Sequence, residues 1–286
     1  MVSLGTPSRL TARERARRTA RGGGPRSAPV PLLVPALIAV AFLVLPLIGL
    51  LIRAPWGHLA AALSGSDATQ ALVLSLWTAT MATALSLVIG VPLAWVLART
   101  SFPGQRLLRA LVTLPLVLPP VVGGVALLLA FGRTGFVGRL LDSWFGLTIP
   151  FTPIAVVMAE TFVAMPFLII TVEGALRSAD QGFEEAAATL GATRMTVFRR
   201  VTMPMIAPSL GAGAVLCWAR ALGEFGATIT FAGSFPGQTE TMPIAVYYAL
   251  ENDPDAAIAL SLVLLLVSIV VLVSLRDHWL RHGTVA

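Results

Sequence analysis

The sequence predicts an all-α polytopic membrane protein with six transmembrane helices, and three observations support this prediction. Of the 286 residues, 56% are hydrophobic and only 12% are charged, whereas soluble domains carry about 25% charged residues. Apolar runs long enough to cross the roughly 30 Å hydrocarbon core of a bilayer recur along the chain. Arginine-rich segments alternate with acidic ones between these runs, as expected for a chain that crosses a membrane repeatedly.

Six runs provide the predicted helices. Four of them contain no charged residue: Val30–Ile52, Ala71–Ala98, Ala110–Phe131 and Ala256–Leu275. Two more, Phe151–Leu176 and Met205–Ala232, are long enough but carry ionisable groups. The third run contains three prolines and two glycines, which free backbone groups that must be satisfied within protein or water. This pattern indicates either a kink against neighbouring helices, which we favour, or part of a substrate route.

Arginine placement predicts the orientation of the chain. There is no lysine, and sixteen of the twenty basic residues lie in the N-terminal tail and in segments 99–109, 177–200 and 276–281. With both termini in the cytoplasm, all four segments lie on the cytoplasmic side, as the positive-inside rule requires. Residues 1–29 are therefore predicted to form a disordered, arginine-rich cytoplasmic tail. Residues 30–276 form the transmembrane domain and 277–286 a cytoplasmic C-terminal tail.

The residues that most enzymes need are absent or scattered. Without lysine, the chain has no nucleotide-binding P-loop. His58, His278 and His282 form no metal-spaced set with other ligands and lie beside no nucleophile. The single Cys217 is expected to be a small buried hydrophobe within the fifth helix. The sequence predicts no catalytic residue, no metal site and no cofactor of its own, and it contains no folded basic module for nucleic acid.

A short charged segment, residues 178–204, interrupts the apolar sequence between the fourth and fifth helices. Ser178 and Gln181 match a capping box at a helix start. Apolar residues then recur at helical spacing on one face: Phe183, Ala186, Ala187 and Leu190. The segment is therefore expected to begin with a short helix whose alanine-rich face allows close approach of another surface.

The second half of this segment predicts a second short helix. Gly191 is expected to end the first helix, Thr193 to cap the second, and Pro204 to stand at the start of the re-entry into the membrane. From physical chemistry alone, the segment is either a hairpin lying on lipid headgroups or a knob held by a second protein.

A resemblance favours the second protein. Glu185-Ala186-Ala187, then Gly191, then Val201-x-Met203-Pro204 resembles the EAA loop of the membrane subunits of bacterial ABC importers, with Val and Met replacing the usual Ile and Leu. In that family the loop is a coupling helix that docks into an ATPase subunit. The resemblance implies that role for Glu184, Glu185, Ala186, Ala187, Leu190, Gly191 and Pro204.

The fifth helix carries charges where the bilayer is expected to surround it. Arg220 and Glu224 lie four residues apart and share a helix face, and Glu160 in the fourth helix is expected to be buried or to face a cavity. Ionisable groups at this depth are candidates for function, although a structural ion pair is an equally good interpretation. The neighbouring small residues permit close helix approach: Gly211, Gly213, Ala214, Gly223 and Gly226.

A second resemblance concerns the substrate. The stretch from 219 to 251, beginning ARALGEFGATITFAG, is similar to molybdate permease subunits of ABC importers, with Ser234 and Met242 in place of the usual Asn and Leu. Sulfate and thiosulfate permeases share part of this pattern and are the near alternative. A translocation pathway is expected near five residues of this stretch: Arg220, Glu224, Gly226, Thr228 and Thr230.

Together, the two resemblances imply a membrane subunit that imports molybdate or tungstate across the bacterial cytoplasmic (inner) membrane. The implied partners are two copies of an ABC ATPase, which bind the ATP and magnesium, an extracytoplasmic molybdate-binding protein, a second copy of the chain and the lipid bilayer. An ATPase-independent secondary transporter or a membrane scaffold is the alternative from another class. Neither would explain the EAA loop.

Overall fold

The computed structural model describes residues 30–57 and 65–280, and within them all regular structure is helical. The predicted tail at 1–29, His58, and His282 in the last residues of the C-terminal tail lie outside the described part. Helix α2 (Val30–Ile52) forms a unit by itself, and the chain from Arg53 onward forms a second unit. The all-α prediction is confirmed.

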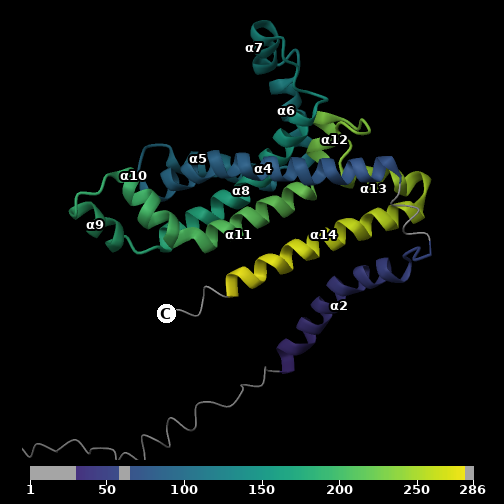
Figure 1. Ribbon diagram of the computed structural model, residues 1–286, viewed down its shortest axis with the longest axis horizontal. Helices are drawn as coiled ribbons and strands as arrows, with labels where there is room; N and C mark the ends of the chain where they lie inside the picture. Colours follow the sequence, from purple (N-terminus) through teal and green to yellow (C-terminus); the bar gives the residue numbers. More distant parts are fainter. Residues whose placement is uncertain (1–29, 58–64, 281–286) are drawn as a thin grey trace, which may run out of the picture. The chain divides into compact units, whose positions relative to one another are not determined.

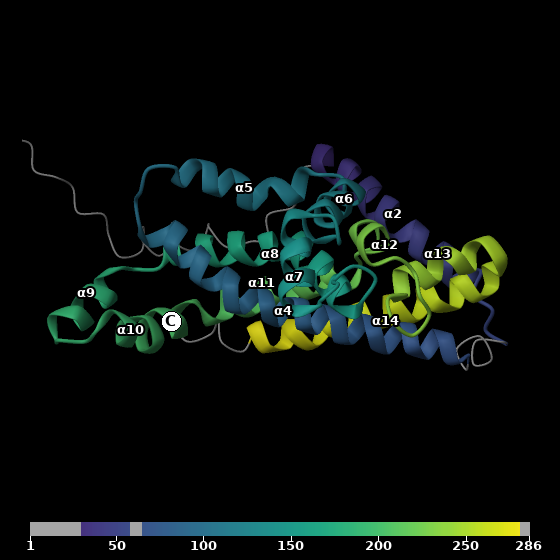
Figure 2. The same ribbon diagram turned by 90° about the horizontal axis from the view of Figure 1, so that it is seen from above.

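Three long helices, α4 (Ser66–Arg99), α8 (Pro153–Ser178) and α11 (Met203–Leu222), lie side by side in the second unit (Figures 1 and 2). Their contact is close because small residues face one another. A Cβ added to Gly213 of α11 would lie 3.1 Å from Leu168 of α8, and Ala79, Ala82 and Ala94 of α4 are fully buried. Dispersion contacts of this kind drive helix association in membranes.

Helix α14 (Pro254–Leu280) runs beside α13 (Met242–Asn252) and contacts α11. It continues to Leu280, past the predicted boundary at residue 276. Five helices of the described chain are long and apolar enough to cross a membrane, and six when a bent pair is counted as one span. The prediction of six spans is met in that sense.

The bent pair is the third predicted span. Helix α5 (Gln105–Val117) and helix α6 (Pro120–Phe131) meet at 118°, so the single long helix predicted here is wrong. Leu118 and Pro119 are extended, because a residue before proline is driven out of the helical region. Two consecutive prolines therefore produce a break far larger than the kink we favoured.

The fifth predicted span is also interrupted. Helix α11 ends at Leu222, and a separate short helix, α12 (Gly226–Ala232), follows. The expected continuous helix to Ala232 is wrong because the Glu224 side chain caps the new helix: its Oε1 accepts a hydrogen bond of 2.9 Å from the Ala227 N–H. A carboxylate at this position satisfies a free backbone donor of the first turn.

Helix α12 packs against α6, and the approach is too close for side chains at the contact. A Cβ added to Gly124 of α6 would lie 2.7 Å from the Ala227 carbonyl oxygen, and one added to Gly226 would lie 2.8 Å from Pro120. A short amphipathic helix, α7 (Phe136–Phe145), follows α6. Figures 1 and 2 show α9 (Gly182–Thr189) and α10 (Arg194–Val197) at one end of the long helices and α13 at the other.

Candidate coupling site and intramembrane charges

Helix α9 begins differently from the prediction. Helix α8 continues to Ser178, whose hydroxyl donates to the Ala175 carbonyl, and Gln181 makes no side-chain cap. The predicted capping box is therefore wrong. Asp180 takes its place, since its Oδ1 accepts a bond of 2.9 Å from the Gly182 N–H. An aspartate before the first turn also opposes the positive end of the helix dipole.

The end of α9 agrees with the prediction. Gly191 has φ of +85°, a conformation that glycine adopts without the strain caused by a Cβ. Its N–H donates to the Ala188 carbonyl at 3.0 Å, and the Ala192 N–H donates to the Ala187 carbonyl at 3.1 Å. These two bonds form a Schellman motif, so the helix stops here and the chain reverses.

One face of α9 is apolar and exposed. Phe183 is 61% exposed and Leu190 89% exposed, while Ala186 is exposed and Ala187 half-buried. Nothing in the described chain covers this face, which we call the outer face: Phe183, Ala186, Ala187 and Leu190. Large apolar side chains presented together on a rigid helix are typical of a surface that another protein covers.

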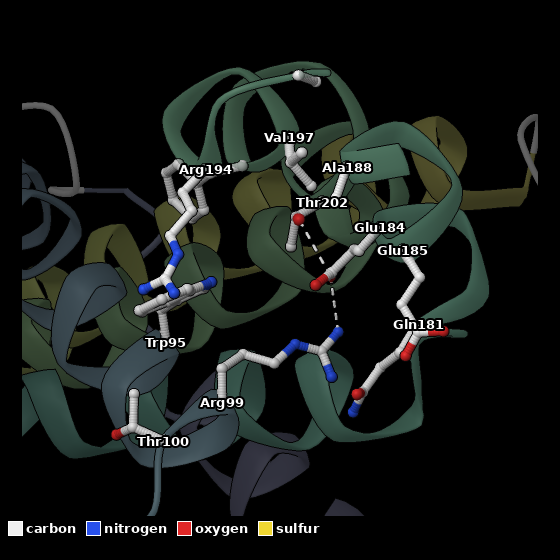
Figure 3. A pocket seen from close by; sticks show the side chains of 12 residues that line it. Trp95, Arg99, Thr100, Gln181, Glu184, Glu185, Ala188, Arg194, Val197 and Thr202 are labelled. Atoms are coloured by element: carbon white, nitrogen blue, oxygen red, sulfur yellow. Dashed lines mark hydrogen bonds and ion pairs between the residues drawn. The ribbon is translucent and has the colours of Figure 1, made fainter. Parts of the chain in front are cut away.

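The opposite side of α9 is fastened to the long helices. Arg99, the last residue of α4, donates from Nη2 to Glu184 Oε1 at 2.8 Å, and the Thr202 hydroxyl donates to the same oxygen at 3.0 Å (Figure 3). The Arg99 and Glu184 side chains are 7% and 19% exposed. A charge-assisted pair in this partly desolvated position holds α9 to α4 and to the start of α11.

Thr193 caps the second helix as predicted, with its hydroxyl oxygen accepting from the Thr196 N–H. Pro204 stands in the first turn of α11, as predicted. The backbone is helical across this start, however, since Arg194–Leu222 is one helical run and a π-helical segment, η1 (Phe198–Thr202), ends two residues before the proline. Wider π geometry accommodates a residue that lacks an N–H and whose ring would crowd the preceding turn.

Sequence reasoning missed the basic residues that hold this end of the bundle. Glu173 of α8 accepts from Arg109 of α5 and from Arg177, each at 2.9 Å. The Glu173–Arg177 spacing of four was readable as a helical ion pair. Arg99 and Arg109 meet their partners across 85 and 64 residues of sequence, and no local pattern signals such contacts.

Within the apolar helices, Arg220 Nη1 lies 2.6 Å from Glu224 Oε2. The Glu224 side chain is only 1% exposed. Two partners compensate for the burial of its charge: the Arg220 guanidinium and the Ala227 N–H in the first turn of α12. Arg220 also lines a small cavity of about 110 Å³ at the α5–α6 break, together with Pro115, Leu118 and Pro120. The predicted ion pair is formed, and it faces the broken span.

The other polar residues predicted at this depth differ in their hydrogen bonding. The Thr230 hydroxyl donates to the Gly226 carbonyl within α12. The Thr228 hydroxyl is buried and has no hydrogen-bond partner among the described residues. Glu160 of α8 is buried and accepts from Thr78 of α4 at 2.9 Å. Within the described ranges, no group of three histidine, cysteine or acidic side chains is arranged to hold a metal.

The chain is similar to known membrane transport proteins. A family model described as binding-protein-dependent transport system inner membrane component matches residues 86–282. The molybdenum transport system permease protein ModB of Mycobacterium tuberculosis is 48% identical over 86% of this chain and 93% of that protein. The sulfate transport system permease protein CysT of Salmonella typhimurium is 35% identical over 86% of this chain and 90% of that protein.

The arrangement of helices also has a counterpart among solved structures. A bacterial alginate ABC transporter, crystallised with an alginate-pentasaccharide-bound periplasmic protein, contains a chain that superposes with a TM-score of 0.72. The match covers 95% of this chain and 98% of that chain at 19% identity. At this identity the similarity concerns the fold alone.

Proposed function

Because the chain belongs to the family of binding-protein-dependent transport system inner membrane components, we propose that it is the membrane-spanning subunit of a molybdate importer and that α9 receives the force of ATP hydrolysis. The chain is a multi-pass transport component of an ABC importer and not an enzyme. ATP hydrolysis belongs to a separate subunit. The family and the apolar helices place it in the inner membrane.

Molybdate is the substrate that the relatives favour. Each alignment covers 86% of the chain, and identity to the molybdenum permease is 48% whereas identity to the sulfate permease is 35%. Tungstate belongs to the same proposal because tungstate and molybdate are tetrahedral dianions of closely similar size. Sulfate is the less supported alternative.

The observation that supports coupling is the contrast between the two sides of α9. Phe183 and Leu190 are exposed on the outer face, while Glu184 is bound to Arg99 and Thr202 behind it. A partner that grips the outer face therefore displaces α4 and α11 together with α9. The exposed face, Glu185 and the reversal at Gly191 would form the surface that an ATPase subunit binds.

The full assembly in this proposal has two copies of this chain, two ATPase subunits and an extracytoplasmic binding protein. Both termini and α9 lie in the cytoplasm, as the arginine distribution predicts. ATP-driven closure of the ATPase pair must favour one bundle arrangement over the other, because only a differential interaction shifts a conformational equilibrium.

The anion pathway is proposed to pass the break between α5 and α6. Arg220 lines the cavity at this break, and the Thr228 hydroxyl in α12 is buried and has no hydrogen-bond partner among the described residues. Weak contacts from several donors permit an anion to be released as well as bound. Glu224 would hold Arg220 in place between passages, and Gly226 and Thr230 would shape the turn that presents these groups.

Docking is tested by ATPase pull-down with matched glycine variants. Gly191 and Gly146 both follow short helices with positive φ, and a Cβ at either would meet no atom within 4 Å. We expect Gly191→Trp and Glu185→Arg to abolish recovery of the ATPase, and Gly146→Trp to leave it unchanged. If all three variants recovered the ATPase equally, α9 would not be part of the docking surface.

Substrate choice is tested by ATP-dependent uptake into proteoliposomes that contain the whole complex. Labelled molybdate should accumulate only with ATP, and tungstate should compete far better than sulfate. Competition by sulfate as strong as that by tungstate would select the sulfate alternative.

A further inference from the structure

Two adjoining cavities lie behind α9, and the proposed transport function assigns no occupant to either. The first, of about 380 Å³, is bounded by polar groups of α4, α9 and α10, including Arg99, Glu184 and Arg194 (Figure 3). The second, of about 260 Å³, is lined almost entirely by apolar atoms, with Pro92, Val96 and Met195 among them. The two cavities share three lining residues: Trp95, Arg194 and Phe198.

The polar cavity contains hydrogen-bond donors that lack acceptors. Arg99 uses Nη2 for Glu184, but its Nε and Nη1 are buried and have no partner in the described part of the chain. Its side chain is only 7% exposed. Leaving donors of a buried charged group unsatisfied costs free energy, so the site favours an occupant that supplies acceptor oxygens.

The charges lining this cavity argue against a small free anion. Arg99 and Arg194 are balanced by Glu184 and Glu185, so a soluble oxyanion would gain little net attraction. Affinity must therefore come in part from apolar contact, which the second cavity provides. Trp95 and Phe198 form its wall in an edge-to-face pair with centroids 6.4 Å apart.

The position of the two cavities along α4 matches the edge of a bilayer. Helix α4 has 34 residues and is thus about 51 Å long, well beyond the roughly 30 Å hydrocarbon core. Its last turns, which carry Pro92, Trp95 and Arg99, fall at headgroup depth, where tryptophan is enriched. The apolar cavity lies on the side of the bilayer core and the polar cavity beyond it.

We propose that an anionic phospholipid binds here, with its phosphodiester in the polar cavity beside Arg99 and Arg194 and an acyl chain in the apolar cavity along Pro92, Val96 and Met195. The cavity as a whole is charge-balanced, but Arg99 and Arg194 can donate to a phosphodiester as basic residues between membrane helices do to acidic headgroups. That the lipid comes from the cytoplasmic leaflet rests on the proposed orientation of α9.

The bound lipid would stand behind the coupling helix, away from the outer face, although the proposed docking residue Glu185 also lines the polar cavity. At about 100° per residue, the cavity-lining Gln181, Glu184 and Ala188 lie on the side of α9 opposite Phe183 and Leu190. The phosphodiester would supply acceptors to Arg99 while Arg99 holds Glu184. Lipid identity would in this way set the rigidity of the connection between α9 and α4.

The test is native mass spectrometry of the purified full-length complex after exposure to phosphatidylglycerol or phosphatidylcholine. We expect phosphatidylglycerol to be retained preferentially, and Arg194→Gln to weaken that retention about fivefold, the effect of one cationic side chain at a membrane surface. The matched control is Arg200→Gln, an exposed arginine of the same helical run that lines neither cavity. A second variant, Met195→Asp, places a carboxylate in the apolar cavity and should also lower retention.

Three results would overturn the proposal: equal loss in Arg194→Gln and Arg200→Gln, equal retention of the two lipids, or displacement of the lipid by equimolar glycerophosphoglycerol. The last result would mean that the headgroup binds without the acyl chain. Lipid retention requires neither ATP nor molybdate. A failure of uptake or of ATPase docking with retention intact would therefore count against the proposed function alone.

Discussion

At the residue scale, two buried or half-buried acids make contacts that join different helices. Glu184 joins α9 to α4 and α11 through Arg99 and Thr202, and Glu224 ends one helix and caps the next while pairing with Arg220. Glu184 lies in the first turn of α9, and Glu224 lies in the short segment between α11 and α12. Each therefore links the orientation of one helix to that of another.

Breaking the Arg99–Glu184 pair should loosen α9 without unfolding the bundle. Removing one partner of a fully buried pair costs about 3–5 kcal/mol, and the 19% exposure of Glu184 leads us to expect about 2–3 kcal/mol for Arg99→Ala. Hydrogen exchange in residues 182–189 should accelerate by at least about tenfold. Arg106→Ala, at an exposed arginine of α5, is the control.

A double variant, Arg99→Leu with Glu184→Leu, should recover much of the lost protection, because an apolar pair leaves no uncompensated charge. If the single Arg99 variant exchanges no faster than the Arg106 variant, the pair does not hold α9.

Glu240 should make the loop before α13 sensitive to pH. Burial raises the pKa of this carboxyl, and the nearby Asp67 adds to the rise while the Ser234 hydroxyl opposes it. The folded loop therefore favours the protonated form, and its stabilisation is present below the ordinary glutamate pKa of about 4.3 and lost as pH rises through the raised value. After correction for intrinsic exchange, residues 233–241 should be better protected at the lower pH.

Glu240→Gln should remove that pH dependence, whereas Asp142→Asn, at an exposed acid of α7, should leave it intact. A pH dependence that persists in the Glu240 variant would assign the effect to another group.

At the element scale, the contact between α6 and α12 sets the shape of the broken third span. Proline at 119 and 120 starts α6 at 118° to α5, and glycine at 124 lets α12 lie against it. Leu118 and Pro120 of the break line the same cavity as Arg220. Irregular backbone at membrane depth is tolerated where protein or water satisfies it.

Gly124→Ala should push α12 away from α6, since the new Cβ would lie 2.7 Å from a backbone carbonyl oxygen that cannot rotate aside. Overpacking of this kind costs about 1–3 kcal/mol. Gly174→Ala is the matched control in α8, because its Cβ would meet nothing within 4 Å, and it should be neutral or stabilising by up to about 1 kcal/mol. Thermal unfolding of the complex in detergent distinguishes the two.

At the scale of the whole molecule, α9 and the Arg220–Glu224 pair contact the same helical run, Arg194–Leu222, at different positions. Thr202 in this run bonds to Glu184, and Arg220 near its end bonds to Glu224. A displacement of α9 that moves this run would thus reach the cavity at the α5–α6 break. This connection is the physical basis of the proposed coupling.

Two variants separate a transport role from a structural role for Arg220. Arg220→Met leaves Glu224 buried without its cation and should reduce both folded yield and uptake. The double variant Arg220→Met with Glu224→Gln should restore the yield, because it removes the unpaired charge, but uptake should stay at least about tenfold below wild type. Restored uptake in the double variant would make the pair purely structural.

The sequence by itself determined the all-α membrane architecture, the short helix between the fourth and fifth predicted spans and the end of α9 at Gly191. The membrane architecture follows from the composition and from a comparison of the lengths of the apolar runs with the thickness of the bilayer. A glycine after an alanine-rich helix acts through local backbone geometry. These features need no knowledge of neighbouring helices.

Only the tertiary structure decided where the long runs break and what holds them. The apolar runs at 110–131 and 205–232 were each predicted as one membrane helix. Hydrophobicity shows how long an apolar segment is, but not whether the helix axis changes direction within it. Their breaks depend on Pro119, on the cap that Glu224 provides and on the close contact between α6 and α12. No local pattern predicted that Arg99 would hold α9. It does so because folding brings Glu184, 85 residues away in the sequence, within hydrogen-bond distance.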